Sequence, residues 1–74
     1  MNFIPRYISV GDRVRLTIPM ANRVGTFPAG HVFHVIDVAF RGDDRLYDLR
    51  DHDLNVLGDV SPAYLERIDD EDSD

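Results

Sequence analysis

Three histidines offer the most obvious chemistry in the sequence, because an imidazole binds metal ions and transfers protons near neutral pH. His31 and His34 lie in the segment HVFHVIDVAF, and His52 stands between two aspartates. HVFHVIDVAF has the composition of a strand, whose side chains alternate between two faces, so His31 and His34 point to opposite sides and do not share one ion. We therefore predict no metal site and no cofactor, and we expect His34 to be a partly buried strand residue.

The remaining reactive side chains do not form a catalytic pattern. The chain has no cysteine, and its serines lack the flanking glycines of a nucleophile elbow. The acidic pairs Asp43–Asp44 and Asp51/Asp53 lie in turn-forming stretches, where nothing indicates the burial that would raise a carboxyl pKa. No glycine-rich phosphate loop is present. The sequence thus predicts that the protein is not an enzyme.

The arginines raise the question of nucleic-acid binding. Arg13, Arg15 and Arg23 would make a basic stripe if the chain brought them together, and each phosphate contact releases a counterion. The net charge of −6 opposes this, because it repels a polyanion. Arg13 and Arg15 would also be explained by cross-strand ion pairs with acids such as Glu66. We predict no nucleic-acid partner and keep these three arginines as the alternative.

The charge is concentrated at the end of the chain. The last seven residues, IDDEDSD, contain five acids and no base. Such a block repels itself, so we expect a folded domain over 1–68 and a disordered acidic tail over 69–74. Two roles for the tail stay open: imitation of nucleic acid in a partner's basic groove, or simple solubilisation.

Length and targeting signals limit the remaining classes. A chain of 74 residues has room for one core. The first ten residues lack the apolar core of a signal peptide, and the longest apolar run is far too short to cross a membrane. The expectation is a cytoplasmic protein with no membrane partner.

The elements that must position these residues are strands. Val14, Leu16 and Ile18 alternate with polar residues until Pro19, and the same period places Tyr47 and Leu49 on one face of RLYDLRD. HVFHVIDVAF forms another strand, apolar on both faces. A fourth strand is expected within 54–60 and a fifth at 65–68. No segment shows a helical period, so the predicted class is all-β.

The segment VSPAYLERI, residues 60–68, indicates how the strands are arranged. Ser61 can cap a 3₁₀ turn, and Pro62 has the fixed φ angle that begins one. VGDRVRL resembles the "G-D-x-V" start of bacterial SH3-like barrels, and VSPAYLERI resembles the closing "P-x-x-Y-[VL]" segment of eukaryotic SH3 domains. Gly30, Val32 and Val35 also resemble a motif of electron-transport accessory subunits and of the nitrile hydratase β-chain.

The resemblance to the SH3-like superfamily implies a small five-stranded barrel with a 3₁₀ turn before its last strand. It also implies an origin in a bacterium or phage, and as alternatives a KOW-like nucleic-acid or ribosome-associated barrel, or an accessory subunit of a redox or hydratase complex. The chain departs from peptide-binding SH3 domains because it has no tryptophan and because its long loop carries Arg23 and no acid.

The long loop over 19–30 supplies the predicted docking surface. Its apolar residues cannot all enter so small a core, so the loop either closes over one end of the barrel or displays an apolar patch. We predict a non-catalytic module for protein binding or self-association, docking through the 19–28 loop and Tyr64. The predicted contact residues are Tyr7, Met20, Arg23, Phe27, Pro28, Pro62 and Tyr64.

Overall fold

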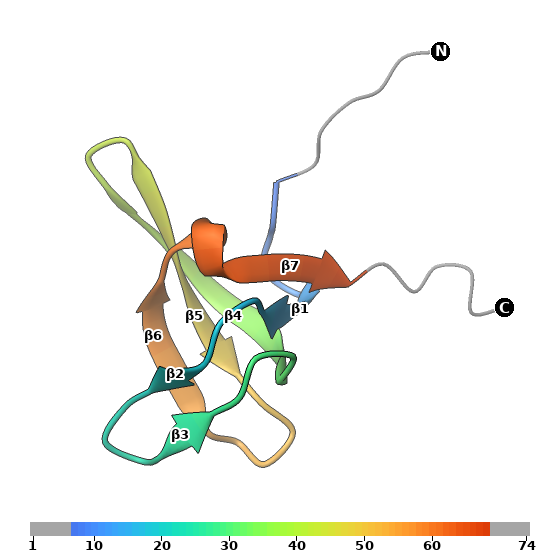
Figure 1. Ribbon diagram of the computed structural model, residues 1–74. Helices are drawn as coiled ribbons and strands as arrows, with labels where there is room; N and C mark the ends of the chain where they lie inside the picture. The colour runs from blue at the N-terminus through green and yellow to red at the C-terminus, as the bar shows by residue number, and fades with distance from the viewer. Residues whose placement is uncertain (1–6, 69–74) are drawn as a thin grey trace, which may run out of the picture.

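The computed structural model describes residues 7–68, and within this range the chain is all-β, as predicted (Figure 1). The elements follow in the order β1 (Arg13–Leu16), β2 (Met20–Ala21), β3 (Thr26–Phe27), β4 (Val32–Arg41), β5 (Asp44–Arg50), β6 (Val56–Val60), η1 (Pro62–Tyr64) and β7 (Leu65–Ile68). The predicted acidic tail, 69–74, and the first six residues of the predicted domain lie outside the described residues.

Five strands form one antiparallel sheet in the order β6-β5-β4-β1-β7. The last strand returns to the first, so that Arg13 lies opposite Ile68 and Leu16 opposite Leu65. The strands β6 and β7 are the two edges of this sheet and are not paired with each other. The sheet is therefore open, whereas the sequence predicted a barrel.

The turn η1 sets the path from β6 to β7. The Ser61 hydroxyl accepts a hydrogen bond from the Ala63 amide at 3.3 Å, and Pro62 occupies the first turn, both as predicted. The Thr17 amide then donates to the Tyr64 carbonyl at 2.9 Å, which fastens the end of the turn beside β1. Because η1 directs the chain onto β1, β7 extends the sheet at that edge.

The core lies on one face of the sheet. Val14 and Leu16 point inward from β1, and Tyr47 and Leu49 from β5, as their alternation predicted. Ile18, expected to continue the pattern, lies beyond the end of β1 and is exposed. The buried apolar residues of the described chain are Val14, Leu16, Phe27, Phe33, Val35, Tyr47, Leu49, Leu57, Val60 and Leu65.

The longest strand, β4, carries a bulge. Its register with β5 shifts between Val35 and Asp37, so Ile36 is the extra residue, and such a bulge kinks a strand and increases its twist. Phe33 and Val35 are buried, which turns His34 to the opposite, exposed face. The prediction of a partly buried His34 is therefore wrong, because the two apolar neighbours take the inward positions.

The segment predicted as a loop over 19–30 contains the short hairpin β2–β3. Met20 lies opposite Phe27, and the Asn22 side-chain oxygen accepts hydrogen bonds from the amides of Val24 (2.8 Å) and Gly25 (3.2 Å), which shapes the turn. The Asn22 side-chain amide donates to the Val56 carbonyl at 2.8 Å and ties the hairpin to β6. Phe27 is only 5% exposed, so its assignment to a docking surface is wrong.

The turn between β5 and β6 is built around Asp51. This carboxylate is buried, contrary to the expectation of a solvated turn residue, and it accepts hydrogen bonds from the amides of Asp53 (2.9 Å) and Asn55 (2.8 Å). The Asn55 side-chain amide donates to it at 3.1 Å, and His31 Nε2 lies at 3.0 Å. A buried charge is tolerated when it is satisfied in this way.

Candidate functional site

The structure divides the predicted docking residues between two places. Met20, Arg23 and Pro28 belong to the β2–β3 hairpin or directly follow it, together with the buried Phe27. Tyr7 and Pro62 line a pocket beside the β4–β5 hairpin. Tyr64 is 41% exposed and does not line this pocket. The sequence therefore named parts of two surfaces.

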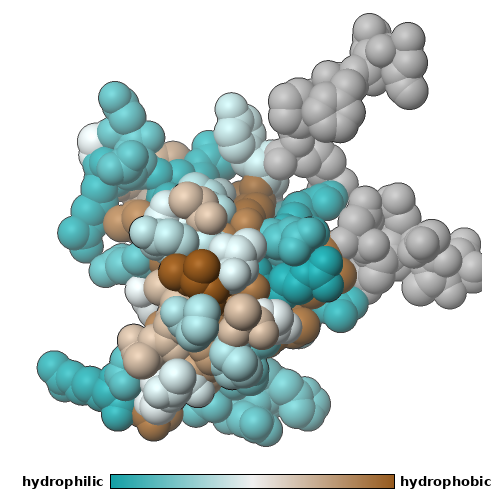
Figure 2. Space-filling view, viewed as in Figure 1, coloured by the Kyte–Doolittle hydropathy of each residue, from teal (hydrophilic) through white to brown (hydrophobic). Residues whose placement is uncertain are grey.

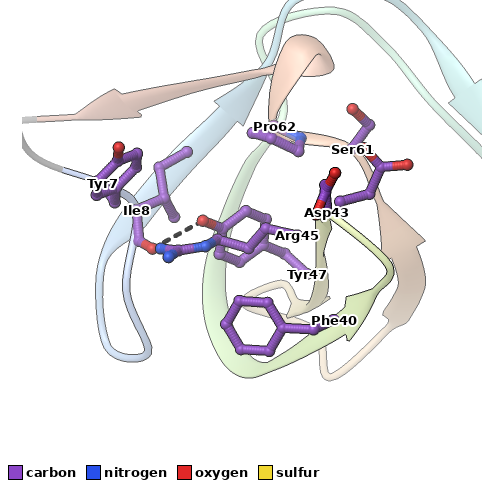
Figure 3. Close-up of a pocket in the computed structure, with 9 residues that line it drawn as sticks. Tyr7, Ile8, Phe40, Asp43, Arg45, Tyr47, Ser61 and Pro62 are labelled. Atoms are coloured by element: carbon purple, nitrogen blue, oxygen red, sulfur yellow. Dashed lines mark hydrogen bonds between the residues drawn. The ribbon is translucent and has the colours of Figure 1, made fainter.

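The pocket has a volume of about 530 Å³ and collects residues from three parts of the chain (Figure 3). These parts are the segment before β1, the hairpin β4–β5 and the start of η1. The lining residues are Tyr7, Ile8, Phe40, Asp43, Asp44, Arg45, Tyr47, Ser61 and Pro62.

Arg45 stands in this pocket between two aromatic rings. Its Cζ atom lies 4.6 Å from the ring centroid of Tyr7 and 5.3 Å from that of Phe40. Tyr7 and Phe40 are 72% and 66% exposed, far more than rings of a core. Cation–π contacts of this kind hold a guanidinium by its face and leave its N–H groups directed along its edge. The pocket thus offers apolar ring surface and oriented hydrogen-bond donors side by side.

The segment carrying Tyr7 is held to the sheet by one buried hydroxyl. The Tyr47 hydroxyl donates to the Ile8 carbonyl at 2.8 Å, a bond drawn in Figure 3. After Ile8 the chain turns back toward β1, with the Asp12 amide donating to the Ser9 carbonyl at 3.0 Å and the Gly11 amide to the Val35 carbonyl at 2.8 Å. The position of Tyr7 over Arg45 therefore depends on packing that starts in the core.

The other wall comes from the tight turn of the β4–β5 hairpin. Arg41 pairs with Asp44 across a connection of Gly42 and Asp43, and Gly42 adopts a φ of 62°, which glycine accepts without strain. Phe40 lies opposite Arg45 in this ladder, so the turn fixes their contact. Asp43 and Asp44 place two carboxylates in the pocket lining.

Sequence reasoning missed Phe40, Arg45 and the aspartates as site residues. The pattern did contain a signal, because Arg45, Tyr47 and Leu49 alternate on one face of their strand. Sequence alone does not give the register that sets Phe40 opposite Arg45. It also does not show that Tyr7, from the segment before β1, lies over the Arg45 guanidinium.

The histidines occupy three separate environments. His31 precedes β4, where its ring lies 5.2 Å from that of Phe27 and 4.9 Å from that of Phe33 between centroids, whereas His34 and His52 are exposed. Burial tends to raise the pKa of Asp51, but hydrogen bonds from Asn55, His31 and the amides of Asn55 and Asp53 outweigh it and lower the pKa to about 2. Within residues 7–68, no three side chains of His, Asp or Glu are grouped so that they could hold a metal ion.

The three arginines proposed for nucleic-acid binding do not form one stripe. Arg13 and Arg15 share a face of β1, but Arg23 lies in the β2–β3 turn. Arg15 Nε donates to Glu66 Oε1 at 3.0 Å, one of the cross-strand pairs that the sequence suggested. This hydrogen bond, with the charge of Arg15, lowers the pKa of Glu66.

On the face of the molecule drawn in Figure 2, the exposed apolar side chains are dispersed. Figure 2 shows one face of the molecule, on which brown apolar residues are separated by pale and teal ones. In the part of the chain that the structure describes, no helix is long and apolar enough to span a membrane. No protein family, no curated protein and no solved structure matches the chain.

Proposed function

We propose that the protein is a non-catalytic binding module that docks a short, extended segment of a partner protein at the pocket around Arg45. The observation that carries this proposal is the exposure of Tyr7 and Phe40 on either side of a positioned guanidinium. The few residues that dominate binding at protein interfaces are enriched in tryptophan, tyrosine and arginine. Pro62 adds a rigid apolar wall.

The arrangement of the strands supports an SH3-like relationship for this module. The first strand pairs with the last, a long connection follows β1, and a Ser61-capped 3₁₀ turn precedes β7. These are the features that the resemblance implies. The resemblance concerns architecture, so the docking function depends on the pocket itself.

The serine hydroxyls of the described residues support a non-catalytic role. Ser9 Oγ donates to the Tyr7 carbonyl at 3.3 Å, and Ser61 Oγ caps η1. Neither hydroxyl is hydrogen-bonded to a histidine, which would serve as its general base. Asp51, the one buried carboxylate among residues 7–68, accepts hydrogen bonds that shape the β5–β6 turn.

Selection from a random peptide library tests the proposal. The full chain is used as bait, and the affinity of selected peptides is measured by fluorescence anisotropy for the wild type, Phe40→Ala and Val24→Ala. Val24 is 67% exposed, nearly the same as Phe40, but lies in the β2–β3 turn and so serves as a matched control. We expect Phe40→Ala to weaken binding about 10-fold or more and Val24→Ala less than about 2-fold.

The opposite ranking of the two variants would move the docking surface to the β2–β3 hairpin, where the sequence placed it. Failure to select any peptide would reject peptide docking. A salt titration with a generic oligonucleotide completes the test, because strong binding that weakens with salt would favour the nucleic-acid alternative.

A further inference from the structure

Positive and negative charges line the pocket around Arg45 without pairing with each other. The guanidinium of Arg45 and the carboxylates of Asp43 and Asp44 belong to its lining, yet no ion pair joins the arginine to either aspartate. In Figure 3, Arg45 extends toward Tyr7, whereas Asp43 is drawn on the side of Pro62. The pocket therefore has a cationic part and an anionic part.

Arg45 keeps a hydrogen-bonding capacity that other arginines of the fold use internally. Arg15 pairs with Glu66 at 3.0 Å, and Arg41 pairs with Asp59 at 3.4 Å. In the described part of the chain no carboxylate pairs with Arg45, whose guanidinium is held by the faces of two rings. Because the N–H groups of a guanidinium lie in its plane, this stacking leaves them for acceptors of a ligand. The fixed orientation also lowers the entropic cost of binding.

The two aspartates of the lining are unpaired as well. Asp43 lies in the β4–β5 turn and Asp44 begins β5, where both are exposed, and neither forms an ion pair within residues 7–68. Neighbouring carboxylates repel each other, so a cation placed beside them lowers the electrostatic free energy of the pocket. A wholly acidic ligand would meet this repulsion, and a wholly basic ligand would be repelled by Arg45.

We infer that the segment docked at this pocket is amphoteric. Its acidic residue pairs with Arg45, and its basic residue pairs with Asp43 and Asp44. Apolar side chains on the same face of the segment cover Phe40 and Pro62. This chemistry of the partner rests on the docking function proposed above. Arg45 and Asp43 are two residues apart, and side chains two residues apart in an extended segment share one face at a separation of about 7 Å, so the two charges of the partner are expected two positions apart.

Five blocked heptapeptides test this chemistry by NMR titration of the ¹⁵N-labelled full chain. Each follows the pattern Leu-Thr-X-Thr-Z-Thr-Leu, in which X and Z share a face with the leucines when the peptide is extended. Two mixed peptides carry Glu and Arg at X and Z, one in each order. The three control peptides carry two Glu, two Arg or two Gln. Amide shifts of Phe40, Arg45 and Ser61 report on the pocket.

We expect the tighter of the two mixed peptides to bind at the pocket about 5-fold or more tightly than each control peptide. Replacement of its Glu by Gln should weaken binding to the wild type about 5-fold or more, but binding to Arg45→Gln less than about 2-fold, because this variant has already lost the pair. Replacement of its Arg by Gln should likewise lose its effect in the double variant Asp43→Asn/Asp44→Asn. Arg23→Gln and Asp53→Asn, at exposed positions of two other turns, should keep both effects.

Failure of this chemistry and failure of docking give different results. Equal affinity of the Gln peptide and the mixed peptides, tighter binding of the Glu or Arg peptide, charge effects that persist in Arg45→Gln, or no saturation at millimolar peptide would each overturn the inference. The docking function itself fails when the random library yields no peptide, or when Phe40→Ala leaves the affinity of every selected peptide unchanged. The peptide comparison uses the wild type, so it decides the matter even where a variant does not fold.

Discussion

His31 Nε2 lies 3.0 Å from Asp51 Oδ2, and this contact joins the start of β4 to the turn between β5 and β6. The ladder between β4 and β5 brings the two segments close together, because His34 lies opposite Arg50, and the hydrogen bond then joins the residues just beyond the end of this ladder. The imidazole also contacts the rings of Phe27 and Phe33, so one polar bond connects the β2–β3 hairpin, the core and the β5–β6 turn. The His31–Asp51 pair therefore stabilises the tertiary structure rather than a single element.

The lowered pKa of Asp51 predicts an acid-sensitive fold. A carboxyl group whose folded-state pKa of about 2 is below its unfolded value of about 3.9 stabilises the protein above the unfolded pKa. This stabilisation should be lost as the pH falls from about 5 to 2. Thermal melts across this range should show a steep fall in Tm for the wild type and a shallower one for Asp51→Asn. Parallel curves would mean that other carboxylates carry the acid sensitivity.

Leu54 offers a substitution that should stabilise the protein. It has a φ of 71°, in the left-handed region that disfavours a leucine side chain, and it is 70% exposed. Leu54→Gly removes this strain and should raise the free energy of unfolding by about 1 kcal/mol. Urea denaturation measures the change. Ala21→Gly is the control, because Ala21 is an exposed strand residue without a positive φ, where glycine should lower the free energy of unfolding by about 0.5–1 kcal/mol. If both variants lowered the free energy of unfolding, Leu54 would not be strained.

The hydrogen bond from Tyr47 to Ile8 should contribute measurably to stability. Tyr47→Phe removes the donor and leaves the Ile8 carbonyl without its partner, so unfolding should become easier by about 1 kcal/mol. Tyr64→Phe, which removes an exposed hydroxyl, should change the free energy of unfolding by less than about 0.5 kcal/mol. Equal effects of the two changes in urea denaturation would show that the bond to Ile8 adds nothing.

Val14 is a position where a charge should prevent folding. The residue is completely buried in the core, and an unpaired carboxylate there costs several kcal/mol, comparable to the total stability of so small a domain. Val14→Asp should give a poorly dispersed NMR spectrum and no cooperative melt, whereas Thr17→Asp, at an exposed position just beyond β1, should fold. A folded Val14→Asp protein would mean that the faces of β1 are reversed.

The tyrosine of η1 should matter little for stability. Tyr64 is 41% exposed, and its main-chain carbonyl, not its ring, makes the bond to Thr17. Tyr64→Ala should lower the free energy of unfolding by less than about 1 kcal/mol, because half-exposed apolar surface contributes little. A much lower Tm, or no cooperative transition, for Tyr64→Ala would mean that the ring belongs to the core. Weaker binding of this variant to a selected peptide would mean that the docking surface includes η1.

Local patterns predicted the parts of the fold that local physics determines. Alternation identified the inward residues Val14, Leu16, Tyr47 and Leu49, and the Ser61-Pro62 pair identified the 3₁₀ turn. The hairpin within 19–30 was missed because each of its strands has only two residues, too short for a period. Asn22 with Gly25 was the available signal for its turn.

Burial of Asp51 and exposure of His34 could not be predicted because they depend on tertiary partners. The charge of Asp51 is accepted in the interior only because His31 and Asn55 reach it. The candidate site was half predicted for the same reason. The sequence identified Tyr7 and Pro62 as contact residues. It did not identify Arg45, because its place in the pocket depends on the β4–β5 register and on the position of the segment before β1, and hydrophobic periodicity indicates neither.

The pairing of β7 with β1 has a consequence for how the protein is made. Leu65 is buried opposite Leu16 although residues 17–64 separate the two in the chain, so this part of the core depends on a contact between distant residues. Closing so long a loop delays folding, as in other domains of high contact order. During synthesis the segments of β4 and β5 emerge before that of β7, so this hairpin forms before the last part of the core is in place.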